Sequence, residues 1–376
     1  MQRKPLSVYV HIPFCVQKCL YCDFLSGKAD ERTKEAYVQA LIRQMEQEAG
    51  NGQYDEYEVK TVYFGGGTPS TLSAEQIERI LCKLKDEFHF AADQQPEISM
   101  ELNPGTVDAV KLQGLYAAGI NRISIGVQSL QDEELRKLGR IHCAEDFYKV
   151  WEEASTAGFD NRNVDLMSGI PGQTLESLES TIRSLLRLSP EHISAYSLIV
   201  EEGTPFYRMY PDGAVDEETD RRMYELTGTM LSQAGYDRYE ISNYAADGME
   251  CRHNIAYWTR QDYLGFGIGA ASLMQNTRYR IQDELAAYIR GEYRHEDTEC
   301  LTVQEQMSET MFLGLRMIRG VSKTEFERQY HRALSDVYGD VIEKHVKNGL
   351  LEEHGDRICL TKRGLDVSNY VMSDFV

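Results

Sequence analysis

Three cysteines near the start of the chain have the spacing of ligands for one metal centre. Cys15, Cys19 and Cys22 form a C-x-x-x-C-x-x-C pattern within the run HIPFCVQKCLYCDF. Three thiolates this close can hold one face of an iron-sulfur cube and leave the fourth iron open to a small molecule. The same logic applies to zinc enzymes, in which three protein ligands leave one coordination position free. We therefore expect the chemistry of the protein at this loop.

Two other interpretations of the cysteines stay open at this point. The thiols could belong to a structural zinc site, with His11 or a distant cysteine as the fourth ligand, although such sites more often use two C-x-x-C pairs. A disulfide scaffold fits poorly, because eight cysteines in 376 residues is a low density and five of them are scattered without a pattern. A cluster held by thiolates also favours a reducing compartment, which predicts a cytoplasmic protein.

The overall composition is that of an ordinary globular protein. Hydrophobic residues make up 42% and charged residues 27% of the chain, and a length of 376 residues suggests two or three domains. Apolar runs all fall short of the roughly 18 residues needed to cross a bilayer, so we expect no integral membrane segment. The formal net charge of −20 argues against a nucleic-acid partner.

Six short runs rich in β-branched and aromatic residues alternate with helical patterns in the first 200 residues. Such alternation predicts βαβ units and a parallel sheet. Six units are too few for a closed eight-stranded barrel, so we predict an α/β fold with a partial six-stranded barrel, its parallel sheet open on one side. Helix starts are marked as well, as by the S-x-x-Q capping signal that begins at Ser73. The expected strands cover residues 6–12, 59–65, 97–103, 122–128, 163–169 and 192–200.

Unusual polar or glycine-rich segments accompany these strands. The cysteine loop follows the first strand and GGGTPS (65–70) follows the second, while Glu101, Gln128 and Asp165 lie in the third, fourth and fifth. Because ligand sites of parallel α/β folds lie at the carboxyl ends of the strands, we expect these residues to line one cleft. As ligand contacts, they suit an amine, a sulfonium or ribose hydroxyls. The structural alternatives are a simple tight turn for the glycines and helix caps or ion pairs for the carboxylates.

The motifs together resemble a known family. The cysteine spacing with Tyr21 before the last cysteine, and GGGTPS after the second strand, are similar to the radical S-adenosylmethionine superfamily. The order of YVHIPFC, GGGTPS, ELNP, SIGVQS, LGRIH and DLMSGIPGQT resembles its oxygen-independent coproporphyrinogen III oxidase group. This resemblance implies a 4Fe-4S cluster on the three cysteines, S-adenosylmethionine on the open iron, and reductive cleavage to a 5′-deoxyadenosyl radical. It also implies that S-adenosylmethionine is contacted by Tyr9, Gly66, Gly67, Thr68, Glu101, Gln128, Arg140 and Asp165.

Two departures separate the chain from the decarboxylases of this group. Those enzymes have a further cysteine where this chain has Phe24, and they carry an N-terminal extension, whereas Cys15 lies close to the start here. The segment CRHNIAYWTRQDYLGFGIGAAS (251–272) resembles instead the H-N-x-x-Y-W segment of the HemW-type heme chaperone branch. This resemblance implies a protein that binds heme and transfers it to acceptor proteins, with an electron donor for the cluster and peripheral contact with membrane hemoproteins. The alternative is radical decarboxylation of coproporphyrinogen III, so whether the chain is an enzyme stays open.

Within that segment, His253 is the candidate heme ligand. Its imidazole could bind the iron, Tyr257 and Trp258 offer flat apolar faces, and Arg252 could pair with a propionate. Cys251 is a further candidate for an iron or covalent contact. The structural alternative is that His253 and Asn254 form hydrogen bonds at the barrel edge and that the two aromatic residues belong to the core.

The pattern changes again near residue 301. Three helical segments, a two-strand ribbon with a turn at residues 354–356 and a last helix predict a mainly helical, winged-helix-like domain. Its 10 Lys or Arg residues against 12 Asp or Glu residues do not favour DNA binding. We therefore divide the chain into a radical S-adenosylmethionine partial barrel (1–215), a connecting region with the HNIAYW motif (216–300) and the C-terminal domain (301–376).

Overall fold

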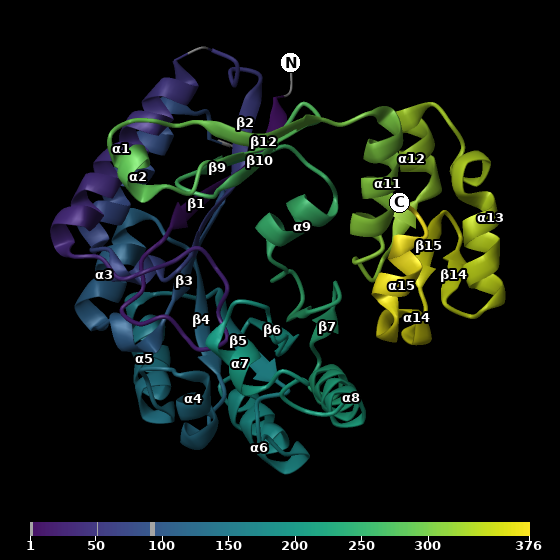
Figure 1. The fold of residues 1–376 in the computed structure, drawn as a ribbon, viewed down its shortest axis with the longest axis horizontal. Coiled ribbons are helices and arrows are strands. Elements are labelled where there is room, and N and C mark those ends of the chain that lie inside the picture. The colour runs from purple at the N-terminus through teal and green to yellow at the C-terminus, as the bar shows by residue number, and fades with distance from the viewer. Residues whose placement is uncertain (1–2, 51, 91–94) are drawn as a thin grey trace.

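A 12-stranded sheet forms the main part of the protein. The structure is a computed structural model that describes residues 3–50, 52–90 and 95–376. The strand order is β12-β11-β10-β9-β1-β2-β3-β4-β5-β6-β8-β7, and neighbouring strands from β1 to β6 run parallel (Figure 1). The central strands are β1 (Lys4–Ile12), β2 (Tyr57–Gly66), β3 (Glu97–Leu102), β4 (Arg122–Gln128), β5 (Arg162–Ser168) and β6 (His192–Ser197). The prediction of six parallel strands that do not close into a barrel is confirmed.

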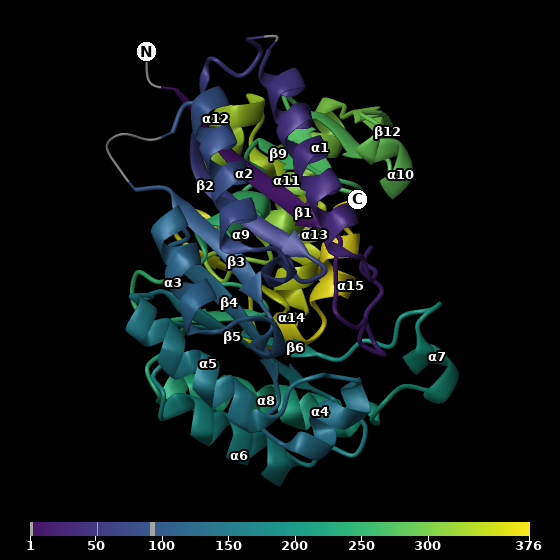
Figure 2. The same ribbon diagram turned by 90° about the vertical axis from the view of Figure 1, so that its left-hand side faces the viewer.

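Helices between these strands cover the outer face of the sheet (Figure 2). The first part of the chain contains α1 (Glu31–Ala49), α2 (Ala74–Glu87), α3 (Ala109–Ala118), α4 (Asp132–Leu138), α5 (Ala144–Ala157), α6 (Leu175–Leu186), α7 (Pro205–Met209) and α8 (Glu217–Gln233), with short turns η1 (Pro69–Thr71) and η2 (Pro104–Thr106). The predicted capping signal at α2 is present, because the Gln76 N–H donates to Ser73 Oγ (3.2 Å) and the Ser73 N–H to Gln76 Oε1 (3.0 Å).

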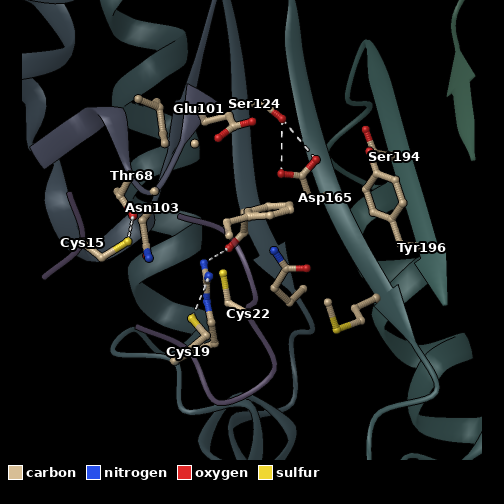
Figure 3. A pocket seen from close by; sticks show the side chains of 18 of the residues that line it. Cys15, Cys19, Cys22, Thr68, Glu101, Asn103, Ser124, Asp165, Ser194 and Tyr196 are labelled. Atoms are coloured by element: carbon tan, nitrogen blue, oxygen red, sulfur yellow. Dashed lines mark hydrogen bonds between the residues drawn. The ribbon is translucent and has the colours of Figure 1, made fainter. Parts of the chain in front are cut away.

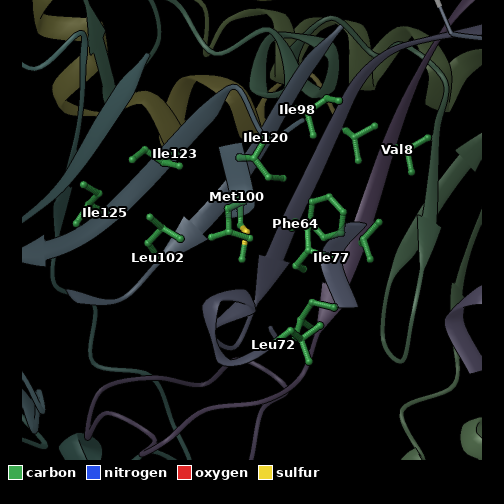
Figure 4. Packing of buried hydrophobic residues seen from close by; sticks show 14 of the residues in the cluster. Val8, Phe64, Leu72, Ile77, Ile98, Met100, Leu102, Ile120, Ile123 and Ile125 are labelled. Atoms are coloured by element: carbon green, nitrogen blue, oxygen red, sulfur yellow. The ribbon is translucent and has the colours of Figure 1, made fainter. Parts of the chain in front are cut away.

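The inner and outer faces of the central strands differ in polarity. All seven residues of β4 are buried; Ile123, Ile125 and Val127 alternate with Arg122, Ser124, Gly126 and Gln128. Successive side chains of a strand point to opposite faces, so the apolar set packs under the helices and the polar set faces the inside of the partial barrel. Figure 4 shows part of the apolar layer, with residues such as Phe64 and Met100 from neighbouring strands. The alternation therefore leaves a polar interior suited to a ligand.

Residues 237–300 extend the sheet at both edges, which the sequence did not indicate. Strands β7 (Asp237–Arg238) and β8 (Asn243–Ala245) follow β6, whereas β9 (Tyr263–Phe266), β10 (Ala271–Met274), β11 (Thr277–Ile281) and β12 (His295–Cys300) continue from β1. Between β8 and β9 the chain passes from one edge of the central strands to the other. Helix α9 (Arg252–Trp258) lies on this path, between the sheet and the C-terminal domain (Figure 1), and α10 (Leu285–Ile289) packs on α1.

The C-terminal domain has a hydrophobic core of its own, which includes Met311, Phe326 and Ile342. It contains α11 (Val303–Gly314), α12 (Lys323–Tyr330), α13 (Leu334–Lys347), α14 (Lys362–Asp366) and α15 (Ser368–Ser373), with the strands β13 (Val321–Ser322), β14 (Leu351–His354) and β15 (Arg357–Leu360). The predicted ribbon is present, and β13 adds a third strand to it. Glu309 joins this domain to the barrel region through a buried ion pair with Arg260 (2.7 Å).

No helix within the described ranges is both long and apolar enough to cross a membrane.

Candidate functional site

The three cysteines lie on a loop that follows β1 and closes on itself. The Cys15 N–H donates to the Gly27 carbonyl oxygen (2.9 Å), and the Gly27 N–H donates to that of Pro13 (2.9 Å). Farther along, the Leu20 N–H donates to the Leu138 carbonyl oxygen (3.1 Å) at the end of α4. Backbone hydrogen bonds therefore hold the loop at its base and at its middle.

Hydrogen-bond donors approach all three thiols, including the Phe24 N–H at Cys22. All three thiols are half-buried, and burial is the main cause that raises the pKa of Cys22. Thr68 Oγ1 lies 3.5 Å from Cys15 Sγ, and Arg140 Nη1 lies 3.6 Å from Cys19 Sγ. A hydroxyl and a guanidinium in these positions stabilise the thiolate forms that bind iron.

The geometry of the loop favours a cluster over a single metal ion. Across residues 3–50, 52–90 and 95–376, no three His, Cys, Asp or Glu side chains lie close enough together to bind one ion. A structural zinc site needs four ligands around one ion. A 4Fe-4S cluster takes each thiolate at a different iron, so its protein ligands stand farther apart. Three separate thiols, each with a neighbouring hydrogen-bond donor, therefore fit a cluster better than zinc.

The glycine run after β2 forms one wall of the cysteine loop. The Thr68 N–H donates to the Phe14 carbonyl oxygen (2.8 Å). A Cβ atom on Gly67 would lie 2.8 Å from that same oxygen and 3.0 Å from Cys15 Sγ. Gly66 has a φ of +114°, which residues with side chains rarely adopt. The run is thus a tight turn, and the missing side chains also let it approach the loop closely.

Glu101 and Asp165 point two carboxyl groups into the same interior (Figure 3). Glu101 Oε1 accepts a hydrogen bond from the Tyr63 hydroxyl (3.1 Å). Asp165 Oδ1 accepts from Ser124 Oγ (3.1 Å) and from Asn163 Nδ2 (2.7 Å). In the described part of the chain, neither carboxyl group caps a helix or forms an ion pair, so neither structural alternative applies.

The two carboxyl groups hold protons more strongly than usual. Burial, followed by the charge of Asp165, raises the pKa of Glu101 to about 8. Burial also raises the pKa of Asp165, although its hydrogen bonds and the nearby Arg122 and Arg140 oppose this. Two ionised carboxylates are therefore unfavourable here near neutral pH. A bound cation would favour their ionised forms.

Arg140 connects the cysteine loop with the end of β4. Its Nη2 donates to the Gly126 carbonyl oxygen (2.6 Å), in addition to the contact with Cys19. Its Nε is buried without a hydrogen-bond partner among the described residues. Gln128 ends β4 with a φ of 61°, at a shift in register between β4 and β5. A buried guanidinium N–H without a partner fits the expected pairing with a ligand carboxylate.

One cavity of about 360 Å³ brings most of the predicted residues together, and this volume is in the range of small-molecule sites. The predicted residues that line it are Cys15, Cys19, Cys22, Gly66, Gly67, Thr68, Glu101, Gln128, Arg140 and Asp165. Tyr9 is not among the described lining residues. Its hydroxyl lies 3.0 Å from His11 Nδ1, and its ring stacks at 6.4 Å on Tyr63, which does line the cavity.

Several lining residues were not predicted from the sequence as ligand contacts. They include Tyr63, Arg122, Ser124, Asn163 and Ser194 on the strands and Asn254 on α9. Those on the strands occupy alternate positions of segments that are otherwise apolar, as Arg122 and Ser124 do in β4. A polar residue at every second strand position was the signal that could have found them.

His253 lies outside the cavity lining and is 1% exposed. Its Nδ1 lies 2.8 Å from Thr61 Oγ1, its Nε2 lies 3.1 Å from the Tyr257 hydroxyl, and its ring stacks on Tyr63 at 5.1 Å. Burial lowers the pKa of His253 to about 3. Since both ring nitrogens are engaged, iron could bind only after one of these hydrogen bonds breaks. The geometry corresponds to the structural interpretation of this residue.

The rest of the HNIAYW motif connects three parts of the molecule. Arg252 Nε lies 3.8 Å from the carboxylate of Glu97 at the start of β3, so this arginine already has a carboxylate partner. The guanidinium of Arg316, from the C-terminal domain, lies 4.3 Å from the Trp258 ring. Asn254 lines the cavity itself.

Similarity to known proteins covers the whole chain. Residues 9–185 match the radical SAM superfamily, and residues 301–367 match the HemN C-terminal domain. The chain is 38% identical to the heme chaperone HemW of Bacillus subtilis (strain 168), over 98% of this chain and 99% of that protein. The chain belongs to the HemW family. The HemW of Escherichia coli (strain K12) is 35% identical and that of Lactococcus lactis (strain IL1403) 34%, and each match covers at least 98% of both chains.

The fold has a close solved counterpart. Coproporphyrinogen III oxidase (HemN) from Escherichia coli aligns with a TM-score of 0.87 over 100% of this chain and 91% of HemN, at 24% sequence identity. At that identity the likeness shows the fold alone. It confirms the predicted fold class, an open parallel α/β sheet with a mainly helical C-terminal domain. Membership in the radical SAM superfamily implies a 4Fe-4S cluster and S-adenosylmethionine, and the loop and cavity described above fit both.

Proposed function

We propose that this HemW-family protein is a heme chaperone that binds heme and transfers it to acceptor proteins. The full-length similarity to curated proteins named heme chaperone HemW, which spans both the sheet region and the C-terminal domain, carries the proposal. Phe24, at the position where the decarboxylases have a further cysteine, agrees with it, because phenylalanine has no thiol; the residue is 62% exposed and lines the cavity.

We assign the cofactors to the loop and the cavity. Cys15, Cys19 and Cys22 would hold the 4Fe-4S cluster, which when bound supplies an electron and an open iron for S-adenosylmethionine. Arg140 would pair with the carboxylate of S-adenosylmethionine, and the glycine run would accommodate its amine. Glu101 and Asp165 would accept from its ribose or lie near its sulfonium. The remaining proposed contacts are Gly66, Gly67, Thr68 and Gln128 in the lining, with Tyr9 supporting Tyr63 from behind.

Heme ligation by His253 is part of the proposal and requires a movement of α9. The hydrogen bonds to Thr61 and Tyr257 must open before a ring nitrogen can reach iron. The N–H groups of Arg252 and His253 at the start of α9 also donate to Glu97 (2.9 and 3.1 Å), so a movement of the whole helix must release these hydrogen bonds as well.

Heme titration of the reconstituted protein tests this function. A Soret band and transfer of heme to an apo-acceptor protein are expected, and their absence would refute the chaperone assignment. His253→Ala should alter the band, whereas Tyr257→Phe, which removes one hydroxyl and keeps the ring, should leave the ligand in place. A band unchanged by His253→Ala would exclude this residue as the iron ligand.

Radical decarboxylation of coproporphyrinogen III is the second candidate. The fold shared with HemN and the coupling of a cysteine loop to one cavity favour it. An anaerobic assay with coproporphyrinogen III, reductant and S-adenosylmethionine decides between the two, because formation of protoporphyrinogen would show that the protein is a decarboxylase.

We further infer a cytoplasmic location, an electron donor for the cluster and peripheral contact with membrane hemoproteins. All eight cysteines lie in the described ranges as free thiols, which agrees with a reducing compartment. The acidic balance of the C-terminal domain supports a protein partner rather than a nucleic acid.

A further inference from the structure

A buried arginine lies at the inner end of the cavity without a hydrogen-bond partner. Arg122, the first residue of β4, is 2% exposed and lines the cavity. Its Nε is buried without a partner, and its guanidinium forms no hydrogen bond or close ion pair with the described residues. It interacts electrostatically with Glu97 and Asp165 but is bonded to neither. Native proteins rarely leave a buried guanidinium unsatisfied, so a ligand is the natural partner.

The strand register separates Arg122 from the cysteine loop. Arg122 aligns with Ser99 of β3, and the next inward-facing residue of β4, Ser124, aligns with Glu101. Gly126, whose carbonyl oxygen holds Arg140, lies four residues beyond Arg122, which is about 13 Å along a strand. The backbone positions that hold the two arginines therefore lie at different depths of the cavity.

Asn254 supplies a second donor on the same cavity. Its side chain is half-buried, lines the cavity and forms no hydrogen bond within the described chain. The neighbouring Asn163, in contrast, is saturated: its Nδ2 donates to Ser124 (2.6 Å) and Asp165 (2.7 Å), and its Oδ1 lies 2.6 Å from His192 Nδ1. An unbonded guanidinium and an unbonded amide are donors that match a carboxylate.

We propose that Arg122 and Asn254 form a carboxylate-binding site at the inner end of the cavity, and that its ligand is a propionate of heme. The assignment rests on the proposed function. The carboxylate of S-adenosylmethionine is already matched by Arg140 near the cysteines, so the deeper site takes the carboxylate of a second molecule. Arg252, the propionate partner expected from the sequence, is engaged by Glu97, whereas Arg122 is not hydrogen-bonded. Asn254 then gives the HNIAYW motif a contact with a propionate that is separate from the proposed bond between His253 and the iron.

Titrations of the reconstituted protein with heme and with heme dimethyl ester test the site, because the ester keeps the macrocycle and iron but lacks the carboxylates. The wild type should bind heme about 10- to 100-fold more tightly than the ester, as expected for a hydrogen bond to a charged group. Arg122→Met should remove this preference by weakening heme binding alone, and Arg122→Lys should restore part of it. Arg136→Met, at an arginine whose side chain is 73% exposed, is the matched control and should change neither affinity.

A second variant covers the case in which Arg122→Met does not fold. Asn254→Asp changes a half-buried side chain and places a carboxylate in the site, so it should weaken heme binding and leave ester binding intact. Equal binding of heme and ester by the wild type overturns the inference and leaves the chaperone function standing. A loss of affinity for S-adenosylmethionine in Arg122→Met, with heme affinity unchanged, assigns the site to the other carboxylate and also overturns it. A wild type that binds neither porphyrin refutes the proposed function itself.

Discussion

Binding of S-adenosylmethionine should release a proton from Glu101. Burial and the nearby charge of Asp165 raise the pKa of this carboxyl group to about 8. Near pH 7 it is therefore about 90% protonated in the free protein, since the pH lies one unit below the pKa. The sulfonium of the ligand favours the ionised carboxylate, so the proton leaves as the cation enters.

The sign and size of the pH effect follow from this competition. Protons bind to the free protein but not to the complex, so affinity rises with pH and levels off above about 8. The ionised fraction increases about 50-fold between about pH 6 and pH 8, which sets the upper limit of the gain in affinity. The groups that act on the pKa of Glu101 are Tyr63, Asp165 and the Gly66 N–H, and the hydroxyls of Tyr9 and Tyr196 also lie within electrostatic range of it. The Tyr63 hydroxyl and the Gly66 N–H lower its pKa, and Asp165 raises it.

Calorimetry in two buffers with different ionisation enthalpies measures the release directly. Near pH 7 we expect about 0.9 proton per S-adenosylmethionine bound to the reconstituted protein. Glu101→Gln should bind with little proton release and little pH dependence. Tyr63→Phe removes a hydrogen bond that lowers the pKa, so it should retain the release and shift the profile to higher pH. A binding heat that does not depend on the buffer, or an unchanged profile in Glu101→Gln, would refute the reasoning.

Four further outcomes are expected. As pH rises from about 4.5 to 8, the free energy of unfolding of apo Glu101→Gln in urea should increase relative to that of the wild type by up to about 5 kcal/mol, because in this range only the folded wild type holds the extra proton. A difference between the two proteins that does not change with pH contradicts this. Cys19→Ser should lose cluster iron and sulfide, whereas Cys82→Ser, at an exposed cysteine, should keep them. Gly67→Ala should lower cluster content, since its Cβ would press on the cysteine loop, and full occupancy would speak against that clash. Glu309→Gln breaks the buried ion pair with Arg260, so it should lower the free energy of unfolding by about 3–5 kcal/mol in urea and make the C-terminal domain easier to cleave by limited proteolysis. Unfolding and cleavage like those of the wild type would contradict this.

Local patterns were sufficient for the central elements and the cluster loop. The strand at 122–128 could be recognised because its alternating side chains are neighbours in the sequence, and α2 could be recognised from its cap at Ser73. The short strands within 237–300 escaped recognition. They contain two to six residues each, and β8 and β9 join the central strands by pairing with β6 and β1, which are distant in the sequence.

The sequence by itself located the cluster ligands, three cysteines on one short loop, and the glycine run that lies beside them. The tertiary structure decided which distant side chains share the interior. His253 is hydrogen-bonded to Thr61, 192 positions away, which buries the residue that the motif had suggested as the heme ligand. Arg122 and Asn254 line the same cavity because the chain crosses the open side of the sheet between β8 and β9. Such pairings depend on strand register and on the path of the chain, and no short stretch of sequence contains either.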